Sequence, residues 1–317
     1  MPGTESVARS PVRPASRLPL KPLLLVLGVA ATAYAVALAA FGEGSLLVTV
    51  ERLWSLAGLQ AAALCLLNYL LRGLRWRLWM AHYRRPLGLF EGLRLYLAGY
   101  TFTPTPGNIG EAARGLLLAR NPLSAAQSLA IFGAERLADL LCLLLMGLPV
   151  LGWLAALAWP GAVPGSLLFV GLAALAALVL LFKCRHWLLL RLSWLREAWQ
   201  CLASRPLVWF GLTGVAWAAQ GLAVWLLCRE AGLPIAPLQA AGFYALAMVG
   251  GALSLLPAGL GGTEALLTGL LVAQGASAAL ALSITVAVRV VTLWLAVAIG
   301  ALALVYSAAI RQEISFR

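Results

Sequence analysis

Long apolar stretches constrain this chain more than any other feature of its sequence. Only 11% of its 317 residues are charged and 62% are hydrophobic, whereas soluble domains carry roughly 25% charged residues. In lipid every backbone polar group must bond within the protein, so apolar stretches of about 20 residues are expected to form spanning helices. The sequence therefore predicts an all-α, polytopic transmembrane helical bundle. Its expected full spans are residues 22–41, 54–71, 124–148, 166–182, 207–228 and 277–307.

The remaining residues indicate one integral membrane domain with a short tail at each end. The first 20 residues are polar and rich in Pro, Ser and Arg, which favours a disordered, basic cytoplasmic tail. Cleavage of the first apolar run as a signal peptide is the less favoured alternative, because this run exceeds the roughly 7–15 residues of a signal sequence. The expected parts are tail 1–20, membrane domain 21–310 with halves at about 21–150 and 165–310, and tail 311–317.

The net charge of +12 fits membrane topology, and we do not expect nucleic-acid binding. The basic residues concentrate beside the apolar stretches, as the positive-inside bias of cytoplasmic loops predicts. One group follows the second span and another follows the fourth, which places these ends and both termini in the cytoplasm. The two groups are Arg72, Arg75, Arg77, Arg84 and Arg85, and Lys183, Arg185, Arg191, Arg196 and Arg205.

Residues 186–201 form a basic segment with a regular aromatic pattern. A helix would bring large apolar side chains, including Trp187, Trp194 and Trp199, near one face and leave the arginines elsewhere. This pattern is typical of a helix that lies in the plane of the membrane interface. The alternative is a cytoplasmic extension of a neighbouring span.

Two further apolar segments, 90–119 and 237–275, are each interrupted by a related Pro/Gly motif. The arms of the first segment have about 14 residues, or ~21 Å as helix, which is less than the ~30 Å hydrocarbon core. We therefore expect two re-entrant helical hairpins that enter from opposite sides, so that the two halves are inverted repeats. A pair of full crossings in each segment is the alternative. The motifs are Pro106-Gly107-Asn108-Ile109-Gly110-Glu111 and Pro257-Ala258-Gly259-Leu260-Gly261-Gly262-Thr263-Glu264.

Seven ionisable residues lie inside apolar segments, either in the two interrupted segments or in the predicted spans 124–148 and 277–307. Each motif glutamate is followed 25 residues later by an arginine, Glu111 by Arg136 and Glu264 by Arg289. An ionised group at mid-bilayer costs at least ~2.5–3.5 kcal/mol, so these groups must pair or face water. We favour a mid-membrane cavity that receives a charged headgroup over the alternative, buried pairs that hold the two halves together. The seven candidates are Glu111, Arg114, Glu135, Arg136, Asp139, Glu264 and Arg289.

The two turns complete the predicted substrate-binding site, because interrupted helices in corresponding halves mark binding sites in many transporters. The first turn is expected to expose free backbone N–H groups at the start of the returning helix, where phosphate is attracted. The motif glutamates also have a simpler explanation, since a carboxylate in a first helical turn favours the helix dipole. That explanation does not cover Arg136 or Arg289. The turn residues are Gly107, Asn108, Gly110, Pro257, Gly259, Gly261 and Gly262.

Sequence motifs for catalysis, cofactors or metals are not found. Neither lysine follows a glycine, as a Walker A loop requires, and no G-x-S-x-G elbow occurs. The histidines, His82 and His186, are too few for a zinc site. Glu135 and Asp139 would suit acid–base chemistry, but no nucleophile lies near them in the sequence. We therefore expect a protein that is not an enzyme and uses no cofactor or metal.

The runs Pro106–Arg114, Glu135–Asp139 and Pro257–Ala265, followed by Arg289, resemble the lysylphosphatidylglycerol synthase transmembrane-region family. The resemblance covers about residues 20–310, with all motifs in order. It implies a multi-pass protein of the bacterial inner membrane that moves or handles lipids, which in some members are aminoacylated phosphatidylglycerols and in others belong to polyprenyl-phosphate pathways. No soluble synthase domain follows Arg317 in the sequence, so lysyl transfer is not expected.

These observations together predict a lipid flippase or translocase. Arg114 and Arg136 would bind phosphate, whereas Glu135 and Asp139 would bind a cationic group or carry a coupling proton. The expected partners are membrane lipids, namely an anionic phospholipid, an aminoacyl-phospholipid or a polyprenyl-phosphate-linked lipid, besides a second copy or a synthase. The alternative is a non-transporting membrane scaffold for a glycosyltransferase or lipid synthase.

Overall fold

The computed structural model of this chain describes residues 32, 36, 45–117, 123–158, 193–254 and 256–315. Within these ranges the chain forms helices and loops without a strand, which confirms the all-α class. The predicted tail 1–20 and most of the predicted span 22–41 lie outside the described residues. So does the whole of the predicted span 166–182.

Helices of very different lengths make up the described chain. The short segments η1, η2 and η3 are 3-10 helices, and η4 is a single π-helical turn. In chain order the elements are α2 (Ser45–Trp54), α3 (Leu56–His82), α4 (Leu89–Gly99), η1 (Tyr100–Phe102), η2 (Pro106–Leu117), α5 (Ala125–Ala158), α7 (Ser193–Ala203), α8 (Pro206–Glu230), α9 (Pro237–Leu253), η3 (Pro257–Gly259), α10 (Gly262–Ala273), α11 (Ala278–Arg289), η4 (Val290–Trp294) and α12 (Leu295–Ser315).

Four helical segments are long and apolar enough to cross a membrane: Leu56–His82, Ala125–Ala155, Pro206–Glu230 and Ala278–Ser307. They confirm four of the predicted spans. The shortest of them, with 25 residues, extends about 37 Å at 1.5 Å per residue, which exceeds the hydrocarbon core. Leucines on the outer faces of α3 and α5 remain exposed, as expected for side chains that face lipid.

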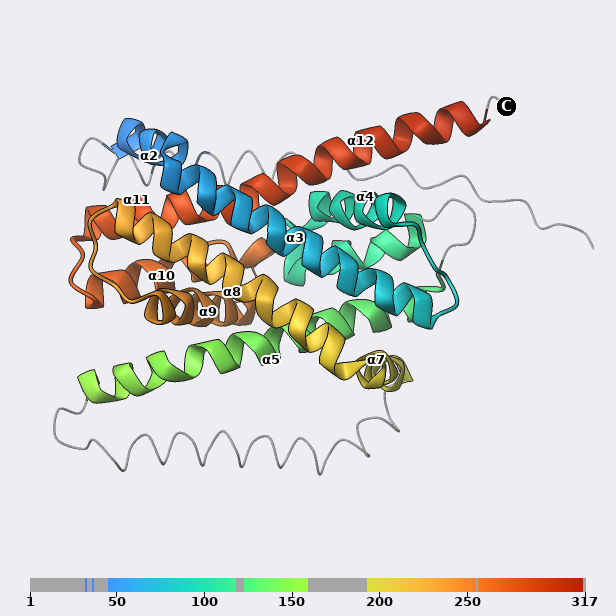
Figure 1. The fold of residues 1–317 in the computed structure, drawn as a ribbon, viewed down its shortest axis with the longest axis horizontal. Helices are drawn as coiled ribbons and strands as arrows, with labels where there is room; N and C mark the ends of the chain where they lie inside the picture. Colours follow the sequence, from blue (N-terminus) through green and yellow to red (C-terminus); the bar gives the residue numbers. More distant parts are fainter. Residues whose placement is uncertain are drawn as a thin grey trace, which may run out of the picture.

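The antiparallel pair α3 and α8 lies at the centre of the bundle (Figure 1). Small side chains allow the two backbones to approach, since Ala61 on α3 and Ala216 and Ala223 on α8 are fully buried. The side chain of Asn68 donates to the carbonyl oxygen of Ala216 at 2.7 Å. Close packing of small residues with one buried hydrogen bond is a common way to join helices in membranes.

The two halves of the chain run in opposite directions (Figure 1). Helix α3 runs from the upper left to the lower right, whereas α8 begins beside α7 and runs back to the upper left. Helix α5 likewise runs toward the left end, whereas α11 and α12 run from the left end to the upper right. The helices that flank the two interrupted segments are therefore antiparallel to their counterparts.

Both interrupted segments are broken at the predicted motifs. The first consists of α4, η1 and η2, and the second consists of α9, η3 and α10. Left-handed backbone occurs at Asn108, Ala258, Gly259 and Gly261, within the two motifs. Helices α9 and α10 pack against each other, and η2 contacts η3. The two breaks therefore meet, although whether each segment is a re-entrant hairpin stays a prediction.

The last span contains a π-helical turn immediately after Arg289. The hydroxyl of Tyr69 on α3 donates to the carbonyl oxygens of Val291 and Thr292, at 3.0 and 2.9 Å. A π turn displaces carbonyl groups from the regular helical pattern, and a buried carbonyl needs a donor. Tyr69 supplies this donor from the other half of the chain.

Helix α7 covers the C-terminal half of the predicted interfacial segment 186–201. Figure 1 shows α7 nearly end-on, whereas α5 and α8 run across the picture. It packs against α5, and a Cβ atom on Gly133 would lie only 2.8 Å from the Trp194 ring. Helix α7 therefore does not continue the direction of α8. Whether α7 lies in the plane of the membrane interface stays a prediction. Residue 187 lies outside the described residues.

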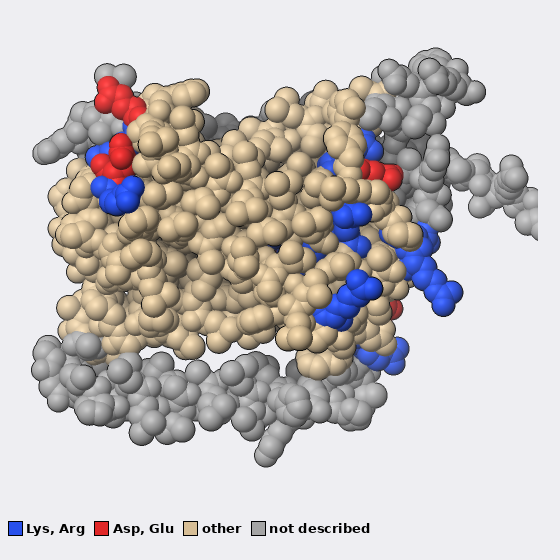
Figure 2. Space-filling view, in the orientation of Figure 1, with Lys and Arg blue, Asp and Glu red and all other residues tan. Residues whose placement is uncertain are grey.

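The charged surface residues of the described chain gather at its two ends (Figure 2). A wide belt between the ends shows neither acidic nor basic atoms on the visible face. Basic residues dominate one end, where Arg84, Arg196 and Arg205 are exposed. The opposite end carries both signs, including Arg229 and Glu230. An uncharged belt of this kind suits contact with lipid tails.

Candidate functional site

Two arginines that the sequence assigned to the cytoplasm are buried inside the bundle. The second span does not end at residue 71, because α3 continues to His82. Arg72 and Arg75 lie one turn apart on its inner face and are 7% and 0% exposed. The prediction that they belong to a cytoplasmic basic cluster is therefore wrong. A signal was present, since buried polar or aromatic residues recur at helical spacing at 68, 69, 72, 75, 76 and 79.

Asp139 on α5 is the acceptor that both of these arginines share. Arg72 Nη2 lies 2.7 Å from Oδ2 of Asp139, and Arg75 Nη1 lies 2.7 Å from Oδ1. The indole of Trp217 on α8 donates to the same Oδ1 at 3.2 Å. Arg75 also donates to the hydroxyl of Thr213 on α8 at 2.9 Å. Asp139 thus joins the α3–α8 pair to α5.

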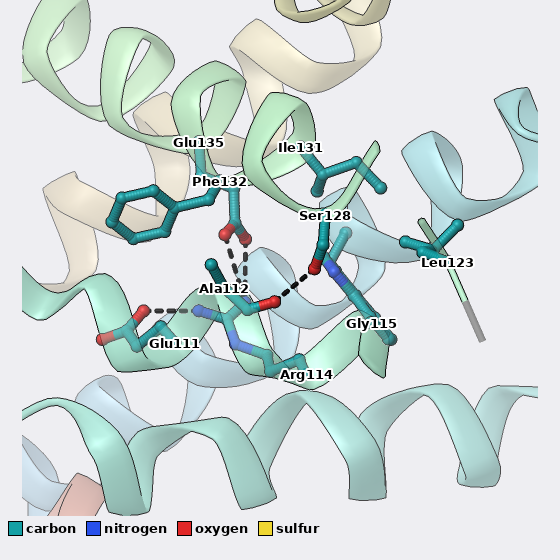
Figure 3. A pocket seen from close by; sticks show the side chains of 10 residues that line it. Glu111, Ala112, Arg114, Gly115, Leu123, Ser128, Ile131, Phe132 and Glu135 are labelled. Carbon is teal, nitrogen blue, oxygen red and sulfur yellow. Dashed lines mark hydrogen bonds and ion pairs between the residues drawn. The ribbon is translucent and has the colours of Figure 1, made fainter. Parts of the chain in front are cut away.

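Arg114 on η2 joins the first Pro/Gly motif to α5. Its Nη1 lies 3.1 Å from both carboxylate oxygens of Glu135, and its Nη2 donates to Oε2 of Glu111. Figure 3 shows the guanidinium between these two carboxylates. Its other face covers the Tyr96 ring at 4.4 Å, and the Thr103 hydroxyl donates to Glu111 at 2.8 Å. The motif is therefore anchored at several points.

Arg136 is the most open member of this cluster. Its side chain is 32% exposed, whereas the side chains of the other paired residues around it are at most 9% exposed. Its contacts are 3.4 Å to Glu111 and 3.5 Å to Asp139. Both are longer than the closest carboxylate contact of each other arginine in this group. The guanidinium lies 5.2 Å from the Phe132 ring centroid. Arg136 is held loosely where the others are held tightly.

We call these residues the central charge cluster. It combines residues from three separate parts of the chain, namely α3, η2 and α5. Arg75 completes it with a longer contact of 3.9 Å to Glu135. Its seven members are Arg72, Arg75, Glu111, Arg114, Glu135, Arg136 and Asp139.

The second motif forms a smaller arrangement, which we call the Glu264–Arg289 pair. Nε of Arg289 donates to Oε1 of Glu264 at 2.6 Å, and Nη2 donates to the carbonyl oxygen of Ala258 at 2.9 Å. The side chains are 2% and 13% exposed. In both motifs, therefore, the glutamate contacts the arginine that follows it by 25 residues.

Two of the backbone N–H groups that were expected to be free in the first turn are bonded within the turn. The N–H of Asn108 donates to the carbonyl oxygen of Thr105 at 2.8 Å, and the N–H of Gly110 donates to the Thr105 hydroxyl at 2.9 Å. These groups are therefore not free, and the expectation was wrong for both. The segment η2 is also a 3-10 helix rather than an α-helix. Charge recognition at this site therefore depends on side chains.

The glycines of the second turn have a steric purpose. Gly259 and Gly261 have φ angles of 67° and 84°, which L side chains rarely adopt. A Cβ atom on Gly262 would lie 3.1 Å from Ser254. Pro257 begins η3 with φ fixed by its ring. These residues let α10 return closely along α9, and Gly107 forms part of η2 in the first turn.

A pocket with a cavity volume of about 10 Å³, room for about one water molecule, lies beside the central charge cluster. Its lining includes Glu111, Arg114 and Glu135, together with apolar groups such as Trp76 and Phe132. The Ser128 hydroxyl donates to the Ala112 carbonyl across it (Figure 3). Sites for small molecules usually enclose ~300–1,000 Å³, so this pocket is narrow. The lining comes from the first half only, and a cavity shared with the Glu264–Arg289 pair stays a prediction.

The chemistry of the site is that of paired guanidinium and carboxylate groups. Among the described residues no group of three or more His, Cys, Asp or Glu side chains is placed to hold a metal ion. Bidentate guanidinium groups suit phosphate and carboxylate ligands. The site is thus equipped to recognise charge in a setting without bulk water.

Comparison with known proteins gives one informative match. No curated protein matches the chain at a significant level. The family described as the lysylphosphatidylglycerol synthase TM region matches residues 23–300, a range that includes the central charge cluster and the Glu264–Arg289 pair. It also agrees with the four helices suited to spanning a membrane. Since the match extends over most of the chain, this protein belongs to the lysylphosphatidylglycerol synthase TM-region family.

Proposed function

We propose that this protein is a lipid translocase that binds a phosphate-bearing headgroup at the central charge cluster. The single observation that carries this proposal is a cluster of seven charged side chains, six of them buried, at the meeting point of α3, η2 and α5. The headgroup would displace the loose contacts of Arg136, while the acyl or prenyl tails remain in lipid. The protein would not be an enzyme and would use no cofactor.

The energetic cost of the cluster supports a binding role. Membrane helices associate through small residues and occasional hydrogen bonds, as α3 and α8 do at Ala216. Buried ion pairs often give no net stabilisation, because desolvation offsets the attraction between the charges. A cluster of seven charges, six of them buried, is therefore a poor means of holding helices together. Ionisable groups inside a membrane protein by default suggest a substrate or ion pathway.

The arrangement of the helices supports alternating access to the cluster. We propose that both interrupted segments are re-entrant hairpins and that the halves are inverted repeats, as in many transporters. The support is that α3 and α8, and likewise α5 and α12, run in opposite directions and that η2 contacts η3. The narrow pocket then corresponds to an occluded conformation.

The distribution of basic residues supports an orientation. We propose that the end with Arg84, Arg196 and Arg205 faces the cytoplasm of a bacterial cell, because cytoplasmic loops are enriched in Lys and Arg. The chain's family is consistent with residence in the inner membrane. Both termini would then be cytoplasmic.

A liposome assay tests the proposed function. Purified protein would be reconstituted with fluorescent phospholipids, and the fraction of label that a membrane-impermeant quencher can reach would report movement between leaflets. We expect Arg136→Ala to abolish the protein-dependent movement of anionic phospholipids. The matched control Arg205→Ala removes an exposed arginine at the end of the bundle and should retain it. Equal inactivity of the native protein and Arg136→Ala over several lipids would refute the proposal.

A scaffold for a lipid synthase or a glycosyltransferase is the second candidate function. The observation that favours it is the narrowness of the pocket, together with the extensive bonding of the cluster to itself. In that case Glu264→Gln and Arg136→Ala should leave cell function unchanged. Replacing the exposed Arg196 and Arg205 together should impair it, because these residues would contact the partner. The opposite pattern would exclude scaffolding.

A further inference from the structure

The central charge cluster contains one more cation than anions. Its arginines are Arg72, Arg75, Arg114 and Arg136, and its acids are Glu111, Glu135 and Asp139. Each carboxylate has a guanidinium nitrogen within 3.1 Å and so belongs to an ion pair. Four guanidinium groups therefore face three carboxylates, and the cluster carries an excess of one positive charge.

No acidic residue elsewhere in the described chain forms part of this cluster. The sequence holds 11 acidic residues, and the structure describes all of these side chains except Glu5, Glu43 and Glu313. The segments 118–122 and 159–192, which lie outside the described residues, contain none. An unneutralised charge is costly to keep inside a membrane. The excess therefore calls for an anion supplied from outside.

The excess charge can be assigned to Arg136. The other three arginines each have a contact of 3.1 Å or less to a carboxylate, whereas both contacts of Arg136 are 3.4 Å or longer. Its Nε atom, like the Nε atoms of the other three arginines, has no hydrogen-bond partner among the described residues. Its side chain is also the one that is 32% exposed. Arg136 is thus the cation that an incoming anion would meet first.

We propose that the site selects lipids by net headgroup charge and takes a phosphodiester lipid whose other headgroup atoms are uncharged. This inference rests on the proposed function and specifies its substrate class. A single negative charge brings the cluster to neutrality. A phosphomonoester lipid carries a charge near −2 above pH 7 and would leave one negative charge in excess. A zwitterionic headgroup would leave the excess as it is, and a cationic aminoacylated headgroup would raise it to two positive charges.

The test measures lipid binding separately from lipid movement. The full-length protein in detergent would be titrated at pH 8 with four lipids of matched acyl chains, and bound lipid would be counted by native mass spectrometry. The lipids are phosphatidylglycerol, phosphatidic acid, phosphatidylcholine and lysyl-phosphatidylglycerol, whose two amines and one phosphate give a net charge of +1. We expect phosphatidylglycerol to bind at least about tenfold more tightly than each of the others. Equal binding of all four would overturn the inference.

Substitutions at Arg136 test the charge count at the one open position of the cluster. Arg136→Lys keeps the charge and should keep the preference for phosphatidylglycerol. Arg136→Gln brings the cluster to neutrality and should shift the preference to phosphatidylcholine. Arg136→Glu should shift it to the aminoacylated lipid. A preference for phosphatidylglycerol that persists in Arg136→Glu would overturn the inference. Arg205→Gln is the control, and it should leave the lipid preference unchanged.

Two further measurements separate the inference from its premises. Soluble glycerophosphoglycerol has the same diester without tails, and its failure to compete with phosphatidylglycerol would show that the ligand is a lipid rather than a free phosphodiester. The liposome assay would be run with the same four lipids. Selective binding without any movement refutes the proposed function alone. Movement of all four lipids at equal rates refutes the charge selection alone.

Discussion

The two glutamate–arginine motifs have the same spacing and different surroundings. In the first, Glu111 and Arg136 are part of a cluster of seven charged residues that connects α3, η2 and α5. In the second, Glu264 and Arg289 bind each other, and Arg289 also bonds the carbonyl of Ala258. The difference arises from the helix before each interrupted segment, since α3 contributes Arg72 and Arg75.

This difference suggests a division of labour between the two halves. The Glu264–Arg289 pair is balanced in charge, and Arg289 fixes the turn through the Ala258 carbonyl. The central charge cluster is unbalanced and has one loosely held arginine beside a pocket. We infer that the second motif mainly holds its turn, whereas the first binds the ligand. The following substitutions test this contrast, from the largest expected effect to the smallest.

Asp139→Asn should cause the largest loss of stability. It removes the charge that two buried guanidinium groups share, at 2.7 Å each. Breaking a buried ion pair typically costs about 3–5 kcal/mol, because the partner charge is left uncompensated. The free energy of unfolding would be measured by denaturant titration in mixed micelles, with Glu197→Gln on α7 as the control. A cost below about 1 kcal/mol would mean that the cluster is not what joins α3 to α5.

Glu264→Gln should cause a smaller loss, of about 1–3 kcal/mol. The amide oxygen still accepts a hydrogen bond from Arg289, and Arg289 keeps its bond to the Ala258 carbonyl. The same titration measures the effect. If this substitution costs as much as Asp139→Asn, the two motifs are energetically equivalent and the proposed contrast is wrong.

Asn108→Ala should cause the smallest loss, of about 1 kcal/mol. Asn108 has a φ angle of 56° in the first turn. In the second turn Ala258 has a similar φ angle of 54°. Asparagine adopts this left-handed conformation more readily than alanine does. Asn108→Gly is the matched control and should stay within about 0.5 kcal/mol of the native protein. An unchanged stability in Asn108→Ala would show that the first turn tolerates alanine as the second does.

Much of the fold could be predicted from local sequence. Apolar length located four spans, and the Pro/Gly motifs located both breaks, because these signals depend on a few neighbouring residues. The fixed spacing singled out the same residues that are in contact in the structure, Glu111 with Arg136 and Glu264 with Arg289. The predicted outer spans 22–41 and 166–182 lie outside the described residues and stay predictions.

The burial of Arg72 and Arg75 could not be predicted in the same way. Arginines that follow an apolar stretch normally mark its cytoplasmic end, and this rule pointed away from the helical spacing of the polar and aromatic residues between 68 and 79. Their burial depends on Asp139 and Trp217, which are far away in sequence and meet them only in the folded bundle. Side-chain hydrogen bonding by Thr105, which occupies the N–H of Gly110, is another detail that composition does not reveal.

The π-helical turn Val290–Trp294 sets the rotational phase between two parts of the last span. Before it, Arg289 is directed to Glu264. After it, Gly300 on α12 packs so closely on η1 that a Cβ atom would lie 2.7 Å from the Thr101 nitrogen. Deleting one residue from the turn would rotate everything beyond it by about 100°. Gly300 would then leave η1, a bulkier side chain would take its place, and the two ends of one helix would no longer be aligned with their separate partners.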